Sequence, residues 1–302
     1  MNTLFEQRYA ASRRQLIQGL GLAGAAMLLP LGHGALAQVK FASDPYRLGI
    51  ASGDAMADGF VIWTKLAPEP LAPHGGMPLV PMPVAWEVAT DTGFREVVAK
   101  GEELARPELG HSVHVEIAGL QPNRPYYYRF TAGGERSLRG TARTLPLPGS
   151  KVDTVKFGVC GCQHFESGYF GAYCHLAREE LDFVYHFGDF IYEYRQEYLF
   201  GDGLPSRPVR QHAFRNLIDL SDYRIAYGQQ LGDVDLQSAR STQTFMSSFD
   251  DHEIHNNWVA DIDADPVPPE IFMLRKQGAL QAWYEHMPVR RGLLPFADIS
   301  RF

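Results

Sequence analysis

The sequence predicts two folded parts, a small β-sandwich of immunoglobulin or fibronectin type followed by an α/β domain with a mainly parallel sheet. Residues 45–145 contain short runs of β-forming residues separated by Gly and Pro. Residues 153–302 instead alternate apolar, strand-like runs with helical segments. Residues 146–152 include two prolines and a Gly-Ser pair, which stop both helix and strand and indicate a linker.

The segment 1–37 has the layout of a secretory signal. Arg13 and Arg14 precede an apolar stretch over 16–31, which ends at the small-x-small pattern Ala35-Leu36-Ala37. The paired arginines indicate twin-arginine export. Because the apolar stretch is short and rich in Gly and Ala, we expect cleavage and no stable membrane span afterwards, with an uncleaved anchor as the alternative. We therefore expect a periplasmic or secreted protein that meets the twin-arginine export machinery.

The predicted sandwich strands follow from local patterns. They are expected at 59–64, 84–89, 112–117 and 126–131. In the third run Val113, Val115 and Ile117 alternate with polar neighbours, which is the period of a half-buried strand. The tyrosines of 126–128 follow a Pro-containing loop, as in fibronectin modules, and we expect them in the core and at a corner of the sandwich.

In the α/β part, strands are expected to end near three residues that can bind metal ions. Strands are predicted at 155–162, 181–189 and 244–251, and helices at 170–178, 220–227 and 274–286, with Ser221 as a candidate cap of the second helix. Ligands of parallel sheets gather beyond the carboxyl ends of the strands. Cys162, Asp189 and Asp251 each fall at such an end, and the loop 195–216 is expected to cover them.

The residue types at these ends suit a two-metal site. The carboxylate of Asp189 can bridge two cations about 3.5–4 Å apart. Tyr192 follows three residues later, and its phenolate suits a trivalent metal such as ferric iron; the alternative is packing in the core beside Tyr194. Cys162 can supply a thiolate, or else serve as a small buried apolar residue.

The motif Asp250-Asp251-His252-Glu253 supplies the other side of the expected site. Asp251 is the expected ligand of a second metal. His252 is placed to bind a phosphoryl oxygen or to protonate a leaving group. Asp250 and Glu253 are expected to hold the turn or to orient ligands.

Composition narrows the function classes. The net charge is −7 and the sequence has no Lys/Arg block, which argues against general nucleic-acid binding. No serine nucleophile elbow and no phosphate-binding Gly loop occur, so covalent and nucleotide-dependent mechanisms are disfavoured. Three cysteines, Cys160, Cys162 and Cys174, leave at least one thiol unpaired, while a disulfide to Cys174 stays open.

Together these motifs resemble the PhoD-type alkaline phosphatases, a family of the metallophosphoesterase superfamily. After the twin-arginine signal the resemblance runs, in order, through Phe60-Val61-Ile62-Trp63-Thr64, Cys162-Gln163, Gly168-Tyr169-Phe170, His186-Phe187-Gly188-Asp189-Phe190-Ile191-Tyr192-Glu193-Tyr194, Asp222-Tyr223-Arg224, Asp235-Leu236-Gln237, Asp250-Asp251-His252-Glu253 and Asn256-Asn257. It implies a β-sandwich followed by an α/β metallophosphoesterase domain. It also implies hydrolysis of small phosphate esters with Fe(3+) and Ca(2+).

Carried over residue by residue, the resemblance places the metal ligands on Cys162, Asp189, Tyr192 and Asp251. The cysteine ligand falls on Cys162 because the glutamine follows it. One departure stands out: the family's later Gly-Asp-x-His ligands have no counterpart before the last residue, Phe302. We therefore expect residues 153–302 to be the N-terminal part of an incomplete metallophosphoesterase domain.

Three alternatives stay open. The chain can be a truncated, inactive remnant that retains partial metal binding. It can also be a phosphodiesterase or phospholipase specialisation of the same fold. The third alternative is a non-enzymatic binding module built on residues 45–145, against which the ordered motifs after Leu145 argue.

Overall fold

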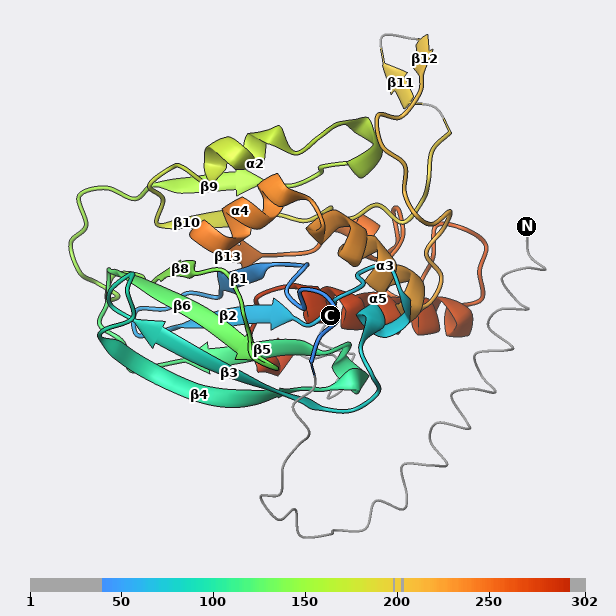
Figure 1. Ribbon diagram of the computed structural model, residues 1–302. Helices are drawn as coiled ribbons and strands as arrows, with labels where there is room; N and C mark the ends of the chain where they lie inside the picture. The colour runs from blue at the N-terminus through green and yellow to red at the C-terminus, as the bar shows by residue number, and fades with distance from the viewer. Residues whose placement is uncertain (1–39, 198, 202–203, 294–302) are drawn as a thin grey trace. The chain divides into compact units, whose positions relative to one another are not determined.

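The described part of the chain contains three β-sheets, one of them the hairpin β11–β12, and four α-helices (Figure 1). The computed structural model describes residues 40–197, 199–201 and 204–293. The strands are β1 (Ile50–Gly53), β2 (Phe60–Lys65), β3 (Met82–Ala89), β4 (Val97–Ala105), β5 (Ser112–Ile117), β6 (Pro125–Ala132), β7 (Glu135–Arg136), β8 (Gly140–Arg143), β9 (Phe157–Cys160), β10 (Phe183–His186), β11 (Leu199–Gly201), β12 (Leu204–Ser206) and β13 (Thr244–Ser247). The α-helices are α2 (Gly171–Leu176), α3 (Leu220–Leu231), α4 (Val234–Thr242) and α5 (Pro269–His286). Short 3-10 turns are η2 (Pro73–Gly76), η3 (Pro107–Leu109), η4 (Phe165–Ser167), η5 (Asp251–Glu253) and η6 (Arg291–Leu293).

The predicted β-sandwich is present. A sheet of order β4-β3-β6-β7, with β8 paired to β6, faces the strands β1, β2 and β5. Tyr126 and Tyr128 are 2% and 0% exposed, so they lie in the core as predicted. The Tyr126 hydroxyl also accepts a hydrogen bond from the backbone N–H of Gln121 at 2.8 Å, which closes the loop before β6.

The half-buried pattern expected for 112–117 is only partly right. Val113, Val115 and Ile117 are buried, but Ser112 and His114 are buried too. The reason is α5, which packs against β5 and stacks the ring of Tyr284 on His114 at 4.3 Å. The local pattern predicted that the polar face of this strand is exposed, but α5, which comes much later in the chain, covers it.

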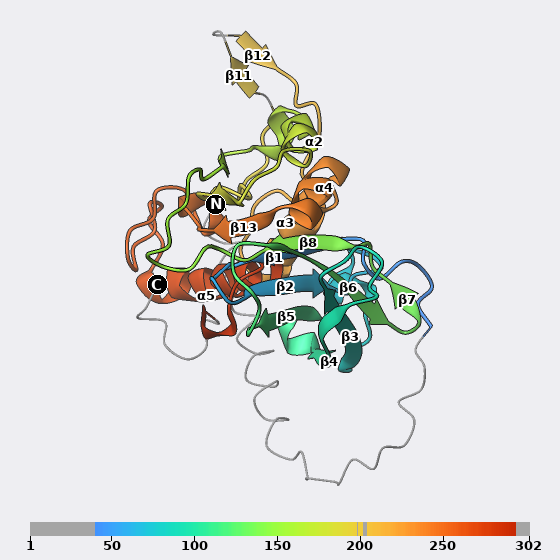
Figure 2. The same cartoon turned by 90° about the vertical axis from the view of Figure 1, so that its left-hand side faces the viewer.

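One six-stranded sheet, of order β5-β2-β1-β13-β10-β9, crosses the predicted boundary between sandwich and α/β part. The junction is the parallel pairing of β1 with β13, in which Ser52 is opposite Thr244. Residues 146–152 contain neither helix nor strand and connect β8 to β9, as expected for a linker. The sandwich therefore shares its inner sheet with the α/β part. Figure 2 shows β3 and β4 at one end of this unit and the hairpin β11–β12 at the other.

The helices confirm the expected α/β pattern with two changes. The first turn of α3 is capped by Asp219, which accepts the Asp222 N–H at 3.1 Å in a capping box, so the assignment of the cap to Ser221 was wrong. Ser221 lies inside the first turn instead. The second change is α4, a helix that local patterns did not predict, capped by Asp233 and packed against β1 and β13.

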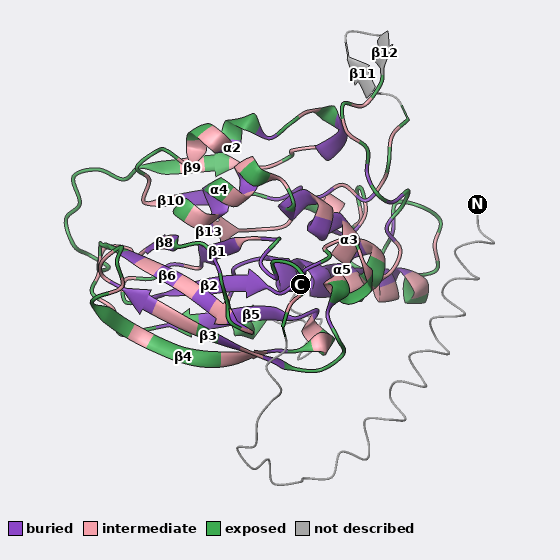
Figure 3. Cartoon of the chain, in the orientation of Figure 1, coloured by how far each residue is buried: buried purple, intermediate pink, exposed green. Residues whose placement is uncertain are grey.

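At its β9–β10 end, the six-stranded sheet has one buried face and one exposed face. Val184, His186 and Phe245 are buried on the side of α2 and α4, whereas Phe157 and Val159 are 56% and 57% exposed on the opposite side (Figure 3). β2, in contrast, is buried along its whole length. Over the described residues, no helix is both long and apolar enough to cross a membrane. The expected signal 1–37 lies outside the described residues.

Candidate metal centre

The three strand ends singled out by the sequence meet at one edge of the sheet. β10 pairs in parallel with β9 and with β13, and His186 is opposite both Cys160 and Ser247. The chain therefore leaves all three strands on the same side. Cys162 and Asp189 lie in the turns that follow β9 and β10, and the backbone N–H of Cys162 donates to the carbonyl oxygen of Gly188 at 3.1 Å. Asp251 begins η5, shortly after β13.

The backbone of these turns is unusual. Cys162 has φ 50° and Asp189 has φ 52°, in the left-handed region that non-glycine residues rarely adopt. Gly188, with φ 123°, approaches the next turn so closely that a Cβ there would lie 2.5 Å from the backbone N of Asp250. Such conformations cluster at functional sites, where the surrounding structure holds them.

Asp189, Cys162 and Tyr192 form a compact group of donors. The Tyr192 hydroxyl donates to Asp189 Oδ2 at 3.2 Å. The other carboxylate oxygen, Oδ1, is buried and has no hydrogen-bond partner within the described part of the chain. Local desolvation, and then the hydrogen bond and charge of Asp189, raise the pKa of the Cys162 thiol to about 11.

The same group fits a cation. Burial, followed by the charges of Asp189 and Cys162, raises the pKa of Tyr192 above its usual value. Desolvation, together with the neighbouring negative charges, thus keeps the Cys162 thiol and the Tyr192 phenol protonated. A bound cation reverses that effect, because it favours thiolate, phenolate and carboxylate together. The orphaned Asp189 Oδ1 is the atom that such an ion would satisfy.

Asp251 and His252 join Asp189 on the other side. One ligand atom from each of these three residues lies within 4.8 Å of the others. The His252 ring packs on that of Tyr192, with 4.3 Å between centroids, and His252 Nδ1 lies 2.8 Å from Glu193 Oε2. Burial lowers the pKa of His252, but the hydrogen bond and charge of Glu193 outweigh it, and the net shift is upward.

Two buried glutamates support the centre. Glu253 was expected to hold the turn, and its carboxylate accepts the backbone N–H groups of Asp189 at 3.0 Å and Asp250 at 2.7 Å. Burial raises its pKa to about 8. Sequence reasoning missed Glu193, which accepts the backbone N–H of Asn256 at 2.8 Å besides contacting His252. Its position next to Tyr192 was the signal available.

A second group of donors, also missed, lies beside the centre. Ligand atoms of His164, Glu166 and His212 lie within 4.8 Å of one another. The loop 195–216, expected to cover the site, contributes His212 and is tied to Glu166 through the Gln196 N–H at 2.8 Å. The only hint in the sequence was the short spacing of His164 and Glu166 after Cys162.

Two family models and several known proteins match this chain. The PhoD-like phosphatase family matches residues 157–300, and its N-terminal domain matches residues 33–146. Alkaline phosphatase D of Bacillus subtilis (strain 168) is 45% identical over 296 residues, which is 96% of this chain and 50% of that protein. A solved structure of PhoD has a TM-score of 0.80 and 46% identity, covering 84% of this chain and 48% of the other.

A purple acid phosphatase from yellow lupin seeds is more distant, with a TM-score of 0.47 and 13% identity over 82% of this chain and 41% of the other. The chain spans about half the length of the curated relative it matches. The two family matches fall on the two predicted parts, the sandwich and the α/β part, and together they cover most of the sequence. The chain therefore belongs to the PhoD-like phosphatase family.

Proposed function

We propose that this chain carries the metal site of an exported hydrolase of phosphoric esters. Cys162, Asp189 and Tyr192 are proposed to hold Fe(3+), and Asp251 a second cation, Ca(2+). The observation that carries this proposal is the buried Oδ1 of Asp189, which has no hydrogen-bond partner among the described residues and lies beside a phenol and a thiol. Hard oxygen donors with one thiolate suit a trivalent cation paired with a divalent one.

Glu193, His252 and Glu253 are assigned the other roles in the proposed hydrolysis. When bound, the two cations would clamp the phosphate and lower the pKa of the attacking water. Glu193 accepts from Nδ1 of His252 at 2.8 Å and so fixes the ring, leaving Nε2 to face the ester. His252 then protonates the departing oxygen through Nε2. Glu253 holds the turns of Asp189 and Asp250 at a fixed separation.

Small phosphate monoesters are the proposed substrates, because the relative at 45% identity is named an alkaline phosphatase. Phosphodiester or phospholipid hydrolysis is the variant that the same metal site would support. Export through the twin-arginine machinery into the periplasm or medium rests on residues 1–37. The competing proposal is that the 302-residue chain binds metal without turnover.

The test compares Asp189→Asn and Tyr192→Phe with the control Asp153→Asn, an exposed acid outside the site. Each full chain is loaded with Fe(3+) and Ca(2+), and bound iron and hydrolysis of p-nitrophenyl phosphate are measured. We expect Asp189→Asn to lose more than about 10²-fold in turnover. Tyr192→Phe should lose the visible absorption of iron-bound phenolate, and the control should match the parent.

The outcomes separate the proposals. Full turnover in Asp189→Asn would refute the assignment of the site. Iron binding that depends on Tyr192 without hydrolysis in the parent chain would support the inactive, metal-binding alternative. Comparing p-nitrophenyl phosphate with bis(p-nitrophenyl) phosphate distinguishes monoesterase from diesterase activity.

A further inference from the structure

A buried cluster beside the proposed centre has no role in the proposed hydrolysis. We define the His-Glu-His cluster as His164, Glu166 and His212. His164 precedes η4, Glu166 lies within it, and His212 comes from the loop that follows β12. Two segments distant in sequence thus deliver two imidazoles and a carboxylate to one place.

The cluster contains buried ring nitrogens that have no hydrogen-bond partner within the described residues. His212 is 5% exposed, and neither of its ring nitrogens has a hydrogen-bond partner within the described residues. Nε2 of His164 is likewise buried and unpartnered there. Glu166 is 0% exposed. Buried polar atoms are nearly always satisfied, so nitrogens that converge on a carboxylate without partners of their own are available to bind a ligand.

We propose that His164, Glu166 and His212 bind a Zn²⁺ ion. Two imidazole nitrogens and one carboxylate oxygen form a common zinc ligand set, with a fourth position left for water. The imidazole of His212 is neutral at neutral pH, since burial lowers its pKa to about 4, so its lone pair is available. Arg210 is the nearby opposing charge, but its guanidinium is bound to Asp233 at 2.7 Å.

The donors are already oriented. Glu166 accepts the backbone N–H groups of Gln196 at 2.8 Å and of His212 at 3.0 Å. Nδ1 of His164 lies 3.0 Å from Ser167 Oγ, which directs the unpartnered Nε2 toward Glu166, 4.0 Å away. Ligands of tetrahedral zinc are about 3.4 Å apart, so atoms that lie within 4.8 Å of one another close by at most about 1.4 Å on binding. Outer hydrogen bonds of this kind raise metal affinity.

The cluster shares no donor with the proposed catalytic centre. The edge of the His164 ring meets the Tyr192 ring at 4.8 Å, so the two are neighbours. A zinc ion here would fix His164 and, through it, the face of Tyr192. Its binding can nevertheless be measured with the first centre disabled.

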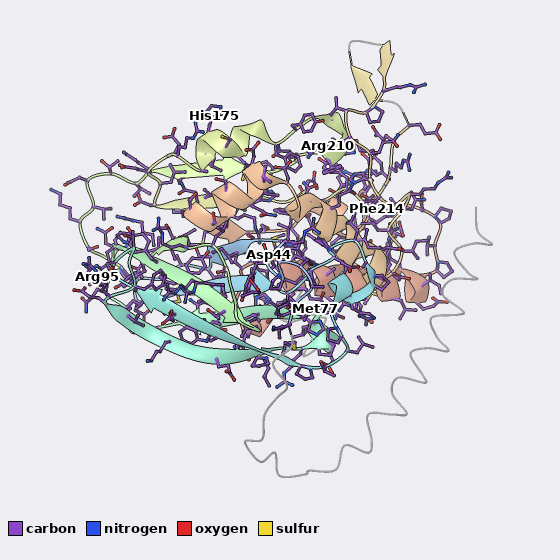
Figure 4. All side chains as sticks on the ribbon, in the orientation of Figure 1. Asp44, Met77, Arg95, His175, Arg210 and Phe214 are labelled. Atoms are coloured by element: carbon purple, nitrogen blue, oxygen red, sulfur yellow. The ribbon has the colours of Figure 1, made fainter. Side chains whose placement is uncertain are left out.

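The experiment titrates Zn²⁺ alone into the full chain carrying Cys162→Ser and Asp189→Asn, by isothermal calorimetry. The test variant adds His212→Gln. The matched control adds His175→Gln, an exposed histidine on α2, apart from Arg210 and Phe214, which flank His212 in the chain (Figure 4). We expect one equivalent of zinc in background and control, and at least tenfold weaker binding in the His212→Gln variant, with circular dichroism confirming that each chain is folded.

Equal zinc binding with and without His212, or an equal loss in the control, would overturn the proposal. If the His212→Gln variant does not fold, Co²⁺ added to the background variant decides. Tetrahedral Co²⁺ absorption is expected from the cluster, and its absence would refute the site. Because no hydrolysis is measured and the first centre is disabled, failure here leaves the proposed function untouched, and the reverse also holds.

Discussion

At the scale of single residues, two of the four proposed metal ligands have a strained backbone. Cys162 and Asp189 have φ values of 50° and 52°. The left-handed conformation costs a non-glycine residue about 1–2 kcal/mol, and a free choice of residue would favour glycine at both positions. That these positions carry a thiol and a carboxylate instead is consistent with selection for chemistry over stability.

Replacing Cys162 with Gly should therefore stabilise the chain while weakening the metal site. The side chain is exposed, so little buried surface is lost. We expect the free energy of unfolding to rise by about 1 kcal/mol, measured by urea denaturation without metal. Cys162→Ala is the matched control, because it removes the thiol but keeps the strain. Equal stability of the Gly and Ala variants would show that the backbone there is not strained.

At the scale of elements, a buried ionic group joins β2, α3 and α5. Lys65 of β2 lies 3.2 Å from Glu285 of α5, and Arg224 of α3 bonds the same carboxylate at 2.6 and 2.7 Å. Glu285 is 0% exposed. Burial lowers the pKa of Lys65 to about 8, although the charge of Glu285 opposes it. One carboxylate thus compensates two cations and ties both helices to the inner sheet of the sandwich.

Glu285→Gln should be strongly destabilising. It leaves Lys65 and Arg224 facing each other without a counter-charge, and breaking a buried pair in this way costs about 3–5 kcal/mol. Glu116→Gln is the control, because Glu116 bonds Arg290 at the surface, where a pair contributes about 0–1 kcal/mol. Chemical denaturation of both variants at pH 7 measures the difference. A loss no larger than that of the control would refute the structural role of this group.

Element prediction from sequence succeeded where the signal was local. Burial alternates along strand β6: Tyr126 and Tyr128 are core residues, as predicted, whereas Tyr127, between them, is only half-buried. Strand β5 failed the same test because α5 covers its polar side. Asp219 was missed as a cap because Ser221 is an equally good capping residue two positions later. Local propensity does not decide between two capping residues in one turn.

The residues of the candidate site also fall into those that local sequence signals indicated and those that they did not. Cys162, Asp189 and Asp251 were found because parallel strands must end at one edge. The contacts of Glu193 with His252 and of His212 with Glu166 are made only in three dimensions; the position of Glu193 beside Tyr192 was a weak signal, and no spacing in the sequence indicates His212. The ligand roles of Cys162, Asp189, Tyr192 and Asp251, and the role of His252, stay predictions until the metal is measured.

At the scale of the whole described unit, the linker at 146–152 suggested two separate parts, but β1 pairs with β13 and makes one sheet of them. A connecting segment shows where the chain leaves a sheet, not whether it returns to the same one. The sandwich is thus a rigid support for the strand ends that carry the proposed metal ligands. Mobility between the two parts is not expected, because six strands share one hydrogen-bonded ladder.

The same sheet leaves an apolar face open at its β9 end, and this predicts self-association. Phe157, Val159 and Tyr185 lie on that face, 56%, 57% and 41% exposed, and β9 is an edge strand. Parallel strands are normally covered on both faces, and open apolar edges template pairing with other chains. Val159→Lys places a charge on this face, and we expect it to weaken association at least tenfold in sedimentation velocity over a concentration series.

Val152→Lys adds the same charge at an exposed valine outside the sheet and should associate like the parent. If both lysine variants behave alike, net charge rather than this face controls association; if the parent is monomeric throughout, the face is not adhesive.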